Sequence, residues 1–236
     1  MRIAGLITLV LLILAGDSFV NPAKQVDQQG SAGTKAQPCQ HTWHGTITLE
    51  VTYKKQGNME NNVIIRRWSE ESYYLAKTQI DGSRNDHGEP IAKVRAVANE
   101  SREEATRGKG ECYRETHESR AVSGTNEETT GFSTLFNPRS REYSLLAPTI
   151  LVYASGQRVL SSRVKGRCNN PYNKDVNHFE KIERHRINDG APTMTGRRPL
   201  DPAKPGEFSG TETLVLEKNG GTKTVTMKWD LRCSGQ

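Results

Sequence analysis

A strict alternation of apolar and polar residues after the first cysteine constrains the fold more than any other feature of the chain. Between Trp43 and Lys54 the odd positions are apolar, apart from a glycine, and the even positions are histidine, threonine, glutamate and lysine. Neighbouring side chains of a strand point to opposite faces of a sheet, so this period of two indicates a β-strand with one buried face. Trp43 is then a core residue. His41 and His44 point to opposite faces, which disfavours a shared metal ion.

A second alternating region, residues 208–233, predicts a β-hairpin near the C-terminus. With Gly220-Gly221 as a two-residue turn, the apolar side chains of both strands share one face. The exception is Glu212, which this register places on the inner face opposite Trp229. We expect Glu212 to lie near a solvent-exposed edge of the sheet.

The middle of the chain contains further strand-like runs separated by glycines, which mark turns. Residues 101–111, which are charged and contain two glycines, allow at most a helical turn. Many short strands without a long helix predict an all-β fold, either an antiparallel β-sandwich or a barrel-like domain. The predicted runs are Val63–Trp68, Tyr73–Ile80, Ile91–Asn99, Glu111–Val122, Tyr143–Leu146, Ile150–Ala154 and Val159–Arg167.

Residues 169–206 interrupt this series of short strand-like runs and contain five prolines. A segment of this length without regular structure is uncommon inside a domain, so we expect a long irregular excursion. Its first part, residues 176–187, is compatible with a short helix, and the remainder with a proline-stiffened coil. On such a helix His178 and His185 would lie two turns apart, about 10 Å along the axis, which is too far for one metal ion.

Cationic residues of this excursion are the candidate binding residues. Arg197 and Arg198 lie among prolines that restrict the chain, and the planar guanidinium group suits carboxylate, phosphate or sulfate. We expect Lys181, Arg184 and Arg186 to add a weaker attractive field. Acidic residues in the same excursion offset this positive charge. The alternative is therefore a solvated surface excursion without a ligand.

The first eighteen residues have the features of a secretory signal peptide: Arg2, an apolar run, and small residues before position 18. The run is too short to span a membrane, which takes about 20 apolar residues. Residues 19–38 are polar and rich in small residues, which predicts a flexible leader before a single all-β domain over residues 39–236. We therefore expect an exported protein, periplasmic or extracellular, whose mature chain has no transmembrane span.

Four cysteines in a chain that enters an oxidising compartment predict two disulfides. Of the three possible pairings, Cys39 with Cys233 and Cys112 with Cys168 is favoured. Cys39 and Cys233 both have the parity of inward-facing tryptophans, and they would lie side by side if the first and last strands pair antiparallel. The cysteines are too widely spaced for a zinc finger, so we predict no metal site.

The formal net charge of +6 favours acidic partners. For an exported protein these are an anionic glycan, a lipid head group or an acidic protein surface, and not intracellular nucleic acid. The sequence contains no nucleophile elbow and no phosphate loop, so we predict neither a catalytic residue nor a cofactor.

These features favour a non-enzymatic binding or structural module of the cell envelope or the extracellular space. Two alternatives stay open. One is a secreted hydrolase that cleaves a glycan through carboxylates from separate strands. The other is a secreted inhibitor of another enzyme, which would use residues 169–206 as a protruding loop.

Overall fold

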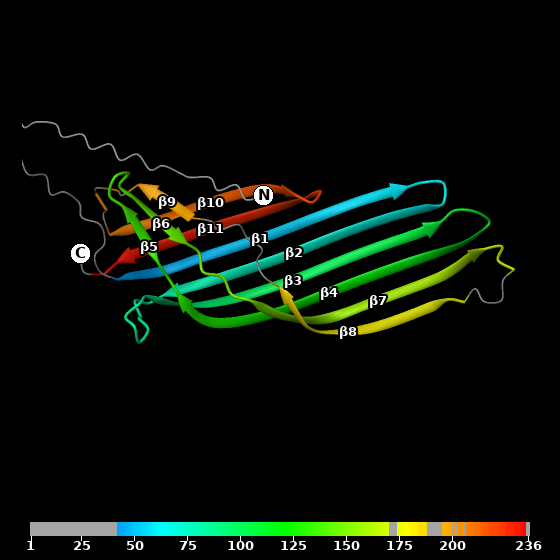
Figure 1. Ribbon diagram of the computed structural model, residues 1–236, viewed down its shortest axis with the longest axis horizontal. Helices are drawn as coiled ribbons and strands as arrows, with labels where there is room; N and C mark the ends of the chain where they lie inside the picture. Colours follow the sequence, from blue (N-terminus) through cyan, green and yellow to red (C-terminus); the bar gives the residue numbers. More distant parts are fainter. Residues whose placement is uncertain are drawn as a thin grey trace, which may run out of the picture. The chain divides into compact units, whose positions relative to one another are not determined.

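The computed structural model describes residues 42–169, 174–187, 195–199, 201, 203–204 and 206–234, all in the second of two compact units of the chain, Ala36–Gln236 (Figure 1). The described residues form strands and no helix, which confirms the predicted all-β fold. The strands are β1 (Trp43–Glu60), β2 (Ile64–Ile80), β3 (Ile91–Gly108), β4 (Cys112–Gly131), β5 (Thr134–Asn137), β6 (Glu142–Leu146), β7 (Val152–Gly166), β8 (Val176–Ile187), β9 (Thr195–Pro199), β10 (Glu207–Lys218) and β11 (Gly221–Cys233).

The strands build two antiparallel sheets, a large and a small one. The large sheet has eight strands in the order β10-β11-β1-β2-β3-β4-β7-β8, and the small sheet has the order β5-β6-β9. The first and last strands of the domain pair antiparallel, with Trp43 opposite Cys233. The small sheet lies against one end of the large sheet, and this arrangement is sandwich-like (Figure 1).

The strands are longer than the sequence pattern predicts. β3 continues to Gly108, so residues 101–108 are extended and do not form the helical turn that the sequence allowed. Ser101 pairs with Glu71 on β2 and with Ala121 on β4. The hydrogen-bonded neighbours on both sides hold this segment extended although its own apolar pattern specifies no strand.

Residues 176–187 form strand β8 and not the predicted short helix. The strand pairs with β7, and a bulge between Ala154 and Gly156 of β7 accompanies a positive φ of 55° at Arg184. Val176, Phe179 and Ile182 have helical spacing, but β7 offers backbone hydrogen bonds to an extended segment, and this pairing buries Ile187 opposite Val152. With β9, the excursion therefore contains two strands and is more regular than expected.

The C-terminal hairpin turns at Asn219-Gly220 and not at Gly220-Gly221. Both residues have positive φ, 53° and 74°, as a type I′ turn requires, and asparagine followed by glycine suits that turn best. The register consequently moves by two residues, and Glu212 lies opposite Met227 instead of Trp229. A shift of two leaves every side chain on its predicted face. Glu212 lies on β10, an edge strand of the large sheet, as predicted.

The apolar core lies between the two sheets. Its centre is an aromatic cluster in which Tyr143 of the small sheet packs against Trp43 and Phe208, with ring centroids 5.2 and 5.3 Å apart. Trp43 is 6% exposed, which confirms its predicted place in the core. The Tyr74 hydroxyl donates to the backbone oxygen of Ile150 at 3.0 Å and accepts from its amide at 3.1 Å, so this buried polar group is satisfied.

Beyond this core, six strands of the large sheet continue without any buried large apolar side chain. In the described residues this region is a single layer with two solvent-facing sides, and it extends past the small sheet (Figure 1). We call it the open half. It comprises residues 52–60 of β1, 64–73 of β2, 99–108 of β3, 112–121 of β4, 156–166 of β7 and 176–182 of β8.

A disulfide closes one end of the open half. Cys112, the first residue of β4, is bonded to Cys168, which follows β7, and this confirms one predicted pair. Cys233 is also disulfide-bonded, whereas its predicted partner Cys39 lies outside the described residues. The predicted signal peptide and the predicted leader lie outside them too. No helix in the described part of the chain is long and apolar enough to cross a membrane.

Candidate functional site

The open half has two chemically different faces. On one face, the side chains lie on the same side of the sheet as the buried core residues, and we call this the core face. The opposite side is the outer face. Because strand residues alternate, Trp68 and Glu104, which lie directly opposite each other, are on the core face, whereas Arg67 and Ala105 form the corresponding pair on the outer face.

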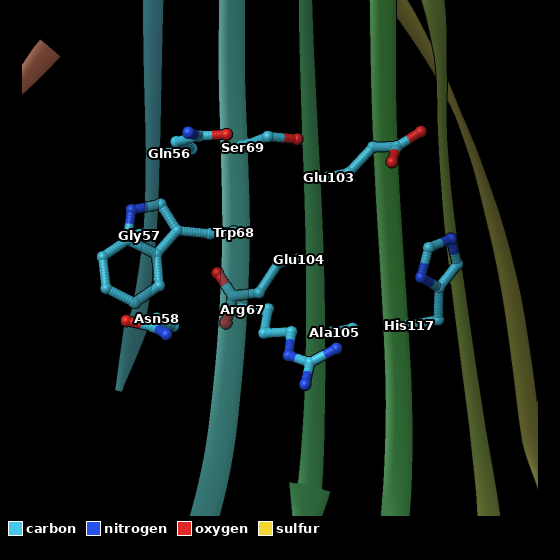
Figure 2. Close-up of a pocket in the computed structure, with 10 residues that line it drawn as sticks. All are labelled: Gln56, Gly57, Asn58, Arg67, Trp68, Ser69, Glu103, Glu104, Ala105 and His117. Atoms are coloured by element: carbon cyan, nitrogen blue, oxygen red, sulfur yellow. The ribbon is translucent and has the colours of Figure 1, made fainter. Parts of the chain in front are cut away.

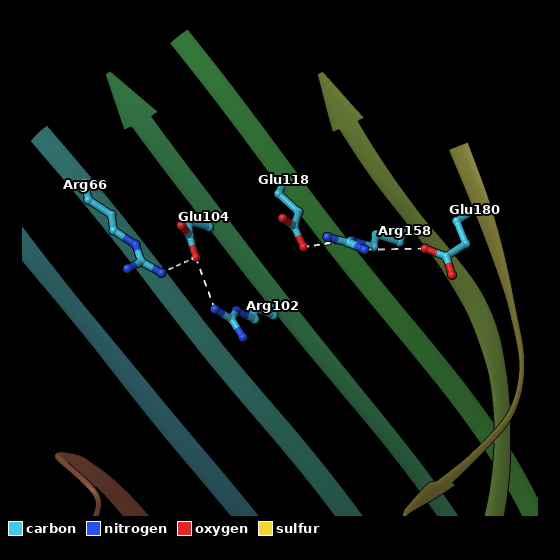
Figure 3. Close-up of polar contacts among 6 residues, drawn as sticks. All are labelled: Arg66, Arg102, Glu104, Glu118, Arg158 and Glu180. Atoms are coloured by element: carbon cyan, nitrogen blue, oxygen red, sulfur yellow. Dashed lines mark hydrogen bonds and ion pairs between the residues drawn. The ribbon is translucent and has the colours of Figure 1, made fainter. Parts of the chain in front are cut away.

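On the core face, two arginines hold Glu104. Arg66 donates to its Oε2 at 2.8 Å and Arg102 at 3.1 Å (Figure 3). The hydrogen bond from Arg66, together with the bond and the charge of Arg102, lowers the pKa of Glu104 below its ordinary value of 4.5. This carboxylate is therefore ionised and internally neutralised at neutral pH.

A second group on the same face is centred on Arg158. Its Nε donates to Glu118 at 2.9 Å, and its Nη1 lies 3.5 Å from Oε2 of Glu180 on the edge strand β8 (Figure 3). The hydrogen bond with Glu118 is the main cause that raises the pKa of Arg158. These contacts link β4, β7 and β8 where no apolar core connects them.

At the border of the open half, His185 connects an arginine and a glutamate in the same way. A guanidinium group only donates, so the 2.9 Å contact from Arg120 makes Nδ1 of His185 the acceptor. The proton then lies on Nε2, which donates to Glu100 at 2.7 Å. The core face of the open half thus satisfies most of its charges internally.

The outer face carries a groove formed by two connected depressions, with volumes of about 630 and 420 Å³. Both are lined by Arg67, Ala105 and His117, which therefore connect them. We call the two together the outer groove. Figure 2 shows that the outer-face side chains of the first depression lie in two cross-strand rows, and that the row between them, Gly57, Trp68 and Glu104, belongs to the core face. The other outer-face residues of the groove are Gln56, Asn58, Ser69, Glu103, Ile65, Arg107, Glu115, Ser161 and Arg163.

Strand register explains why this surface is hollowed. Arg67, Ala105 and His117 occupy one cross-strand row, with the alanine between the two longer side chains. The methyl group of Ala105 fills little of the space that separates its neighbours. A cationic side chain and an imidazole therefore border a shallow floor made of small residues (Figure 2).

The arginines of the groove differ in their partners. Arg107 lies 3.7 Å from Glu115 and donates to the Tyr113 hydroxyl at 3.1 Å, so it is held in place. Arg67 and Arg163 are exposed, and neither forms an ion pair or a side-chain hydrogen bond with another described residue. The pKa of Glu60 is lowered by Lys109 and, to a smaller extent, by the charge of Arg67, and Glu115 lies directly opposite Arg163. Because neither carboxylate forms a hydrogen bond with these two arginines, both guanidinium groups keep donors for an external anion.

The structure places Arg197 and Arg198, the predicted binding pair, on β9 of the small sheet. Arg198 is engaged within the protein, because it donates to the backbone oxygen of Thr211 at 2.9 Å and lies 5.4 Å from the Trp229 ring. It also lies 3.8 Å from Glu212. Arg197 is exposed, and its backbone amide donates to Glu212 at 3.2 Å.

Lys181, Arg184 and Arg186 lie on β8, the edge strand at the other end of the large sheet. Gly196 of β9 packs against side chains of β11, which neighbours the opposite edge. The structure therefore does not bring the two predicted cationic groups together. Lys181 is also paired with Glu183 at 2.8 Å, and this hydrogen bond raises the pKa of the lysine.

Reasoning from the sequence did not single out Arg67, His117 and Arg163. His117, for example, lies in Arg114–Arg120 of β4, a segment where residues of both parities are polar. A strand with two polar faces inside a long β-protein is itself a signal of a sheet open to solvent on both sides. The alignment of these three residues depends on register between strands, which this signal does not supply.

No family model, no curated protein and no solved structure matches this chain. In the described residues, no group of three or more histidine, cysteine, aspartate or glutamate side chains has the geometry of a metal site.

The hydrolase alternative depends on the carboxylates of the molecule. Such an enzyme needs one carboxylic acid whose pKa is raised, so that it can donate a proton to the leaving group. Glu103 and Glu104 point to opposite faces, and the pKa of Glu104 is lowered by Arg66. Every shift resolved for a described carboxyl group is downward.

Proposed function

We propose that this protein is a non-enzymatic binding module, exported to the cell envelope or the extracellular space, that engages an anionic partner through the outer groove. The observation that carries this proposal is the contrast between the two faces of the open half. The core face pairs its charges internally, whereas Arg67 and Arg163 on the outer face form no ion pair and no side-chain hydrogen bond among the described residues. Unpaired guanidinium groups beside a groove are suited to carboxylate, sulfate or phosphate.

The geometry supports an extended partner with more than one anionic group. Arg67 on β2 and Arg163 on β7 are three strand intervals apart, about 14 Å at the usual strand spacing. Asn58, His117 and Ser161 lie in the same row as Arg67 and add hydrogen-bonding groups. All are on paired strands, so little backbone freedom is lost when the partner binds.

Two features support export. The N-terminal sequence has the pattern of a signal peptide, and the Cys112–Cys168 disulfide is typical of proteins in oxidising compartments. The net charge of +6 would attract an anionic partner at long range.

The proposal is tested with the double variant Arg67→Ala, Arg163→Ala. Binding to an immobilised polyuronate, a sulfated polysaccharide and vesicles of equal parts phosphatidylglycerol and phosphatidylcholine is measured at low and high salt. We expect the wild type to bind at least one of these surfaces and the variant to bind it about ten-fold or more weakly, with the difference shrinking in high salt.

The matched control is Arg139→Ala, Lys174→Ala, which removes two exposed cations outside the groove. A parallel variant, Arg197→Ala, Arg198→Ala, tests the binding pair expected from the sequence. Equal binding by the groove variant and the wild type would refute the groove, and a loss confined to the parallel variant would move the site to β9. Release of reducing sugar from the polysaccharides would contradict the non-enzymatic role.

A further inference from the structure

The outer face continues beyond the outer groove and covers the core end of the large sheet. There, one cross-strand row contains Thr211 of β10, Lys228 of β11, Thr48 of β1, Lys77 of β2 and Arg95 of β3. Each residue is directly opposite the next, so all five side chains lie on the outer face. We call this row the cationic row.

The three cations of this row are not neutralised by an ion pair. Lys77 and Arg95 are directly opposite each other, and like charges at such positions destabilise a sheet. Both are exposed, as is Lys228, and none of the three comes within ion-pairing distance of a described carboxylate. Glu127 is opposite Arg95 on its other side, but the two do not form an ion pair.

A shallow depression of about 450 Å³ lies beside Lys228. Hydroxyl groups dominate its polar lining, and one carboxylate is present. In the neighbouring row, Thr46 is followed by Gln79 and the exposed Lys93, which adds a fourth cation. The polar side chains of the depression, apart from Lys228, are Thr46, Thr48, Ser209, Thr211 and Asp230.

We propose that the cationic row is a second anion-binding site, which takes an acidic polysaccharide lying across the strands. It rests on different residues from the outer groove and does not require the groove to function. Lys228 and Lys77 are two strand intervals apart, about 10 Å, and Arg95 is about 5 Å further on. A sugar chain along this row meets the cations in succession.

The chemistry of the row favours a polysaccharide over other polyanions. Thr211 and Thr48 alternate with the cations, and an acidic sugar chain likewise presents hydroxyl and acid groups in succession. A membrane surface would also need apolar side chains, yet none of the exposed large hydrophobic residues belongs to these two rows. Single-stranded nucleic acid would need aromatic rings for its bases, and these rows contain none.

The test uses the double variant Lys77→Ala, Arg95→Ala with four probes: a soluble polyuronate, a sulfated polysaccharide, DNA, and vesicles of equal parts phosphatidylglycerol and phosphatidylcholine. Removing two cations is expected to weaken binding of an acidic polysaccharide by about thirty-fold. Thr48→Val removes one hydroxyl without changing the charge, and is expected to weaken that binding about three- to ten-fold while leaving any residual DNA or vesicle binding unchanged.

Arg139→Ala, Lys174→Ala serves as the charge-matched control and should bind like the wild type. The row variant is expected to unfold in urea at the same concentration or a higher one, because it relieves a like-charge pair. Lys228→Gln is a second, single-site test of the same row. It is expected to weaken polysaccharide binding in the same direction.

Several outcomes overturn the proposal. They are equal polysaccharide binding by the row variant and the wild type, a preference of the wild type for vesicles or DNA, or no binding of any probe. Loss of polysaccharide binding in the Arg67→Ala, Arg163→Ala variant, with the row variant unaffected, would refute the row and leave the groove standing. The reverse result would retain the row and refute the groove.

Discussion

Trp68 lies flat against Gly57, the residue directly opposite it on the neighbouring strand, and any Cβ at position 57 would overlap the indole ring. The ring is half-buried, with the Arg66 guanidinium carbon 5.6 Å from its centroid. The described part of the chain places no second layer over this ring, and the backbone of the next strand provides the apolar contact. A glycine within a strand is otherwise unfavourable, and here it allows this close approach.

We therefore expect Gly57→Ala to displace Trp68 and to destabilise the open half by about 1 kcal/mol or more. Hydrogen exchange should become faster for the amides of residues 52–60 and 64–73, while the amides that flank the core remain protected. Gln56→Ala, on the outer face of the same strand, is the control. Unchanged exchange in the Gly57 variant would show that the indole contact does not stabilise this region.

Arg197 and Arg198 should differ in their effect on stability although they are adjacent. Arg198→Ala removes the hydrogen bond to the Thr211 carbonyl and the contact with Trp229, which hold β9 against the large sheet. We expect the free energy of unfolding in urea to fall by about 1 kcal/mol. Arg197→Ala should change it by less than about 0.5 kcal/mol, because its side chain is exposed. Equal losses in the two variants would contradict this assignment.

Removal of the Cys112–Cys168 disulfide should mainly affect the end of the open half. The bond joins residues separated by 56 positions, and the chain-entropy model assigns such a loop about 4 kcal/mol. We expect the variant Cys112→Ala, Cys168→Ala to lose up to this amount, and its amides at the start of β4 and the end of β7 to exchange first. If protection is lost uniformly over the domain instead, the disulfide stabilises the whole fold and not this end.

Glu104 should make the stability of the protein depend on pH in acid. Its pKa is lowered in the folded protein, mainly by the hydrogen bond from Arg66, so folding favours the ionised carboxylate. This contribution is fully present above the ordinary value of 4.5 and is lost as the pH falls through the lowered value. Glu104→Gln should thus lower the free energy of unfolding by about 1 kcal/mol or less at neutral pH.

The difference between Glu104→Gln and the wild type should disappear in urea titrations at a pH below the lowered pKa. Glu103→Gln is the matched control, because Glu103 is exposed on the outer face and forms no ion pair with the described residues. A difference that persists unchanged into strong acid would mean that the glutamine disturbs packing and that the charge of Glu104 contributes nothing.

The sequence by itself determined the all-β class and the inward face of the core strands. The alternation around Ile47 and around Trp229 places both residues in the core, because a strand buries every second side chain and only one parity is apolar. The same reasoning placed Glu212 at an edge. A register shift of two residues leaves each side chain on the same face of the sheet. The predicted faces are therefore confirmed although the predicted hairpin turn is wrong.

Only the tertiary structure decided where the strands end and how the outer face is assembled. In residues 101–108 both parities are polar, and in β8 the apolar residues are divided between both parities, so alternation indicates no single buried face. Neighbouring strands supply the hydrogen bonds that keep these segments extended. Arg67, Ala105 and His117 belong to β2, β3 and β4, and Lys228, Lys77 and Arg95 belong to β11, β2 and β3. Residues so far apart in the chain meet only through register between strands, which the long-range backbone pairing sets and no local pattern encodes.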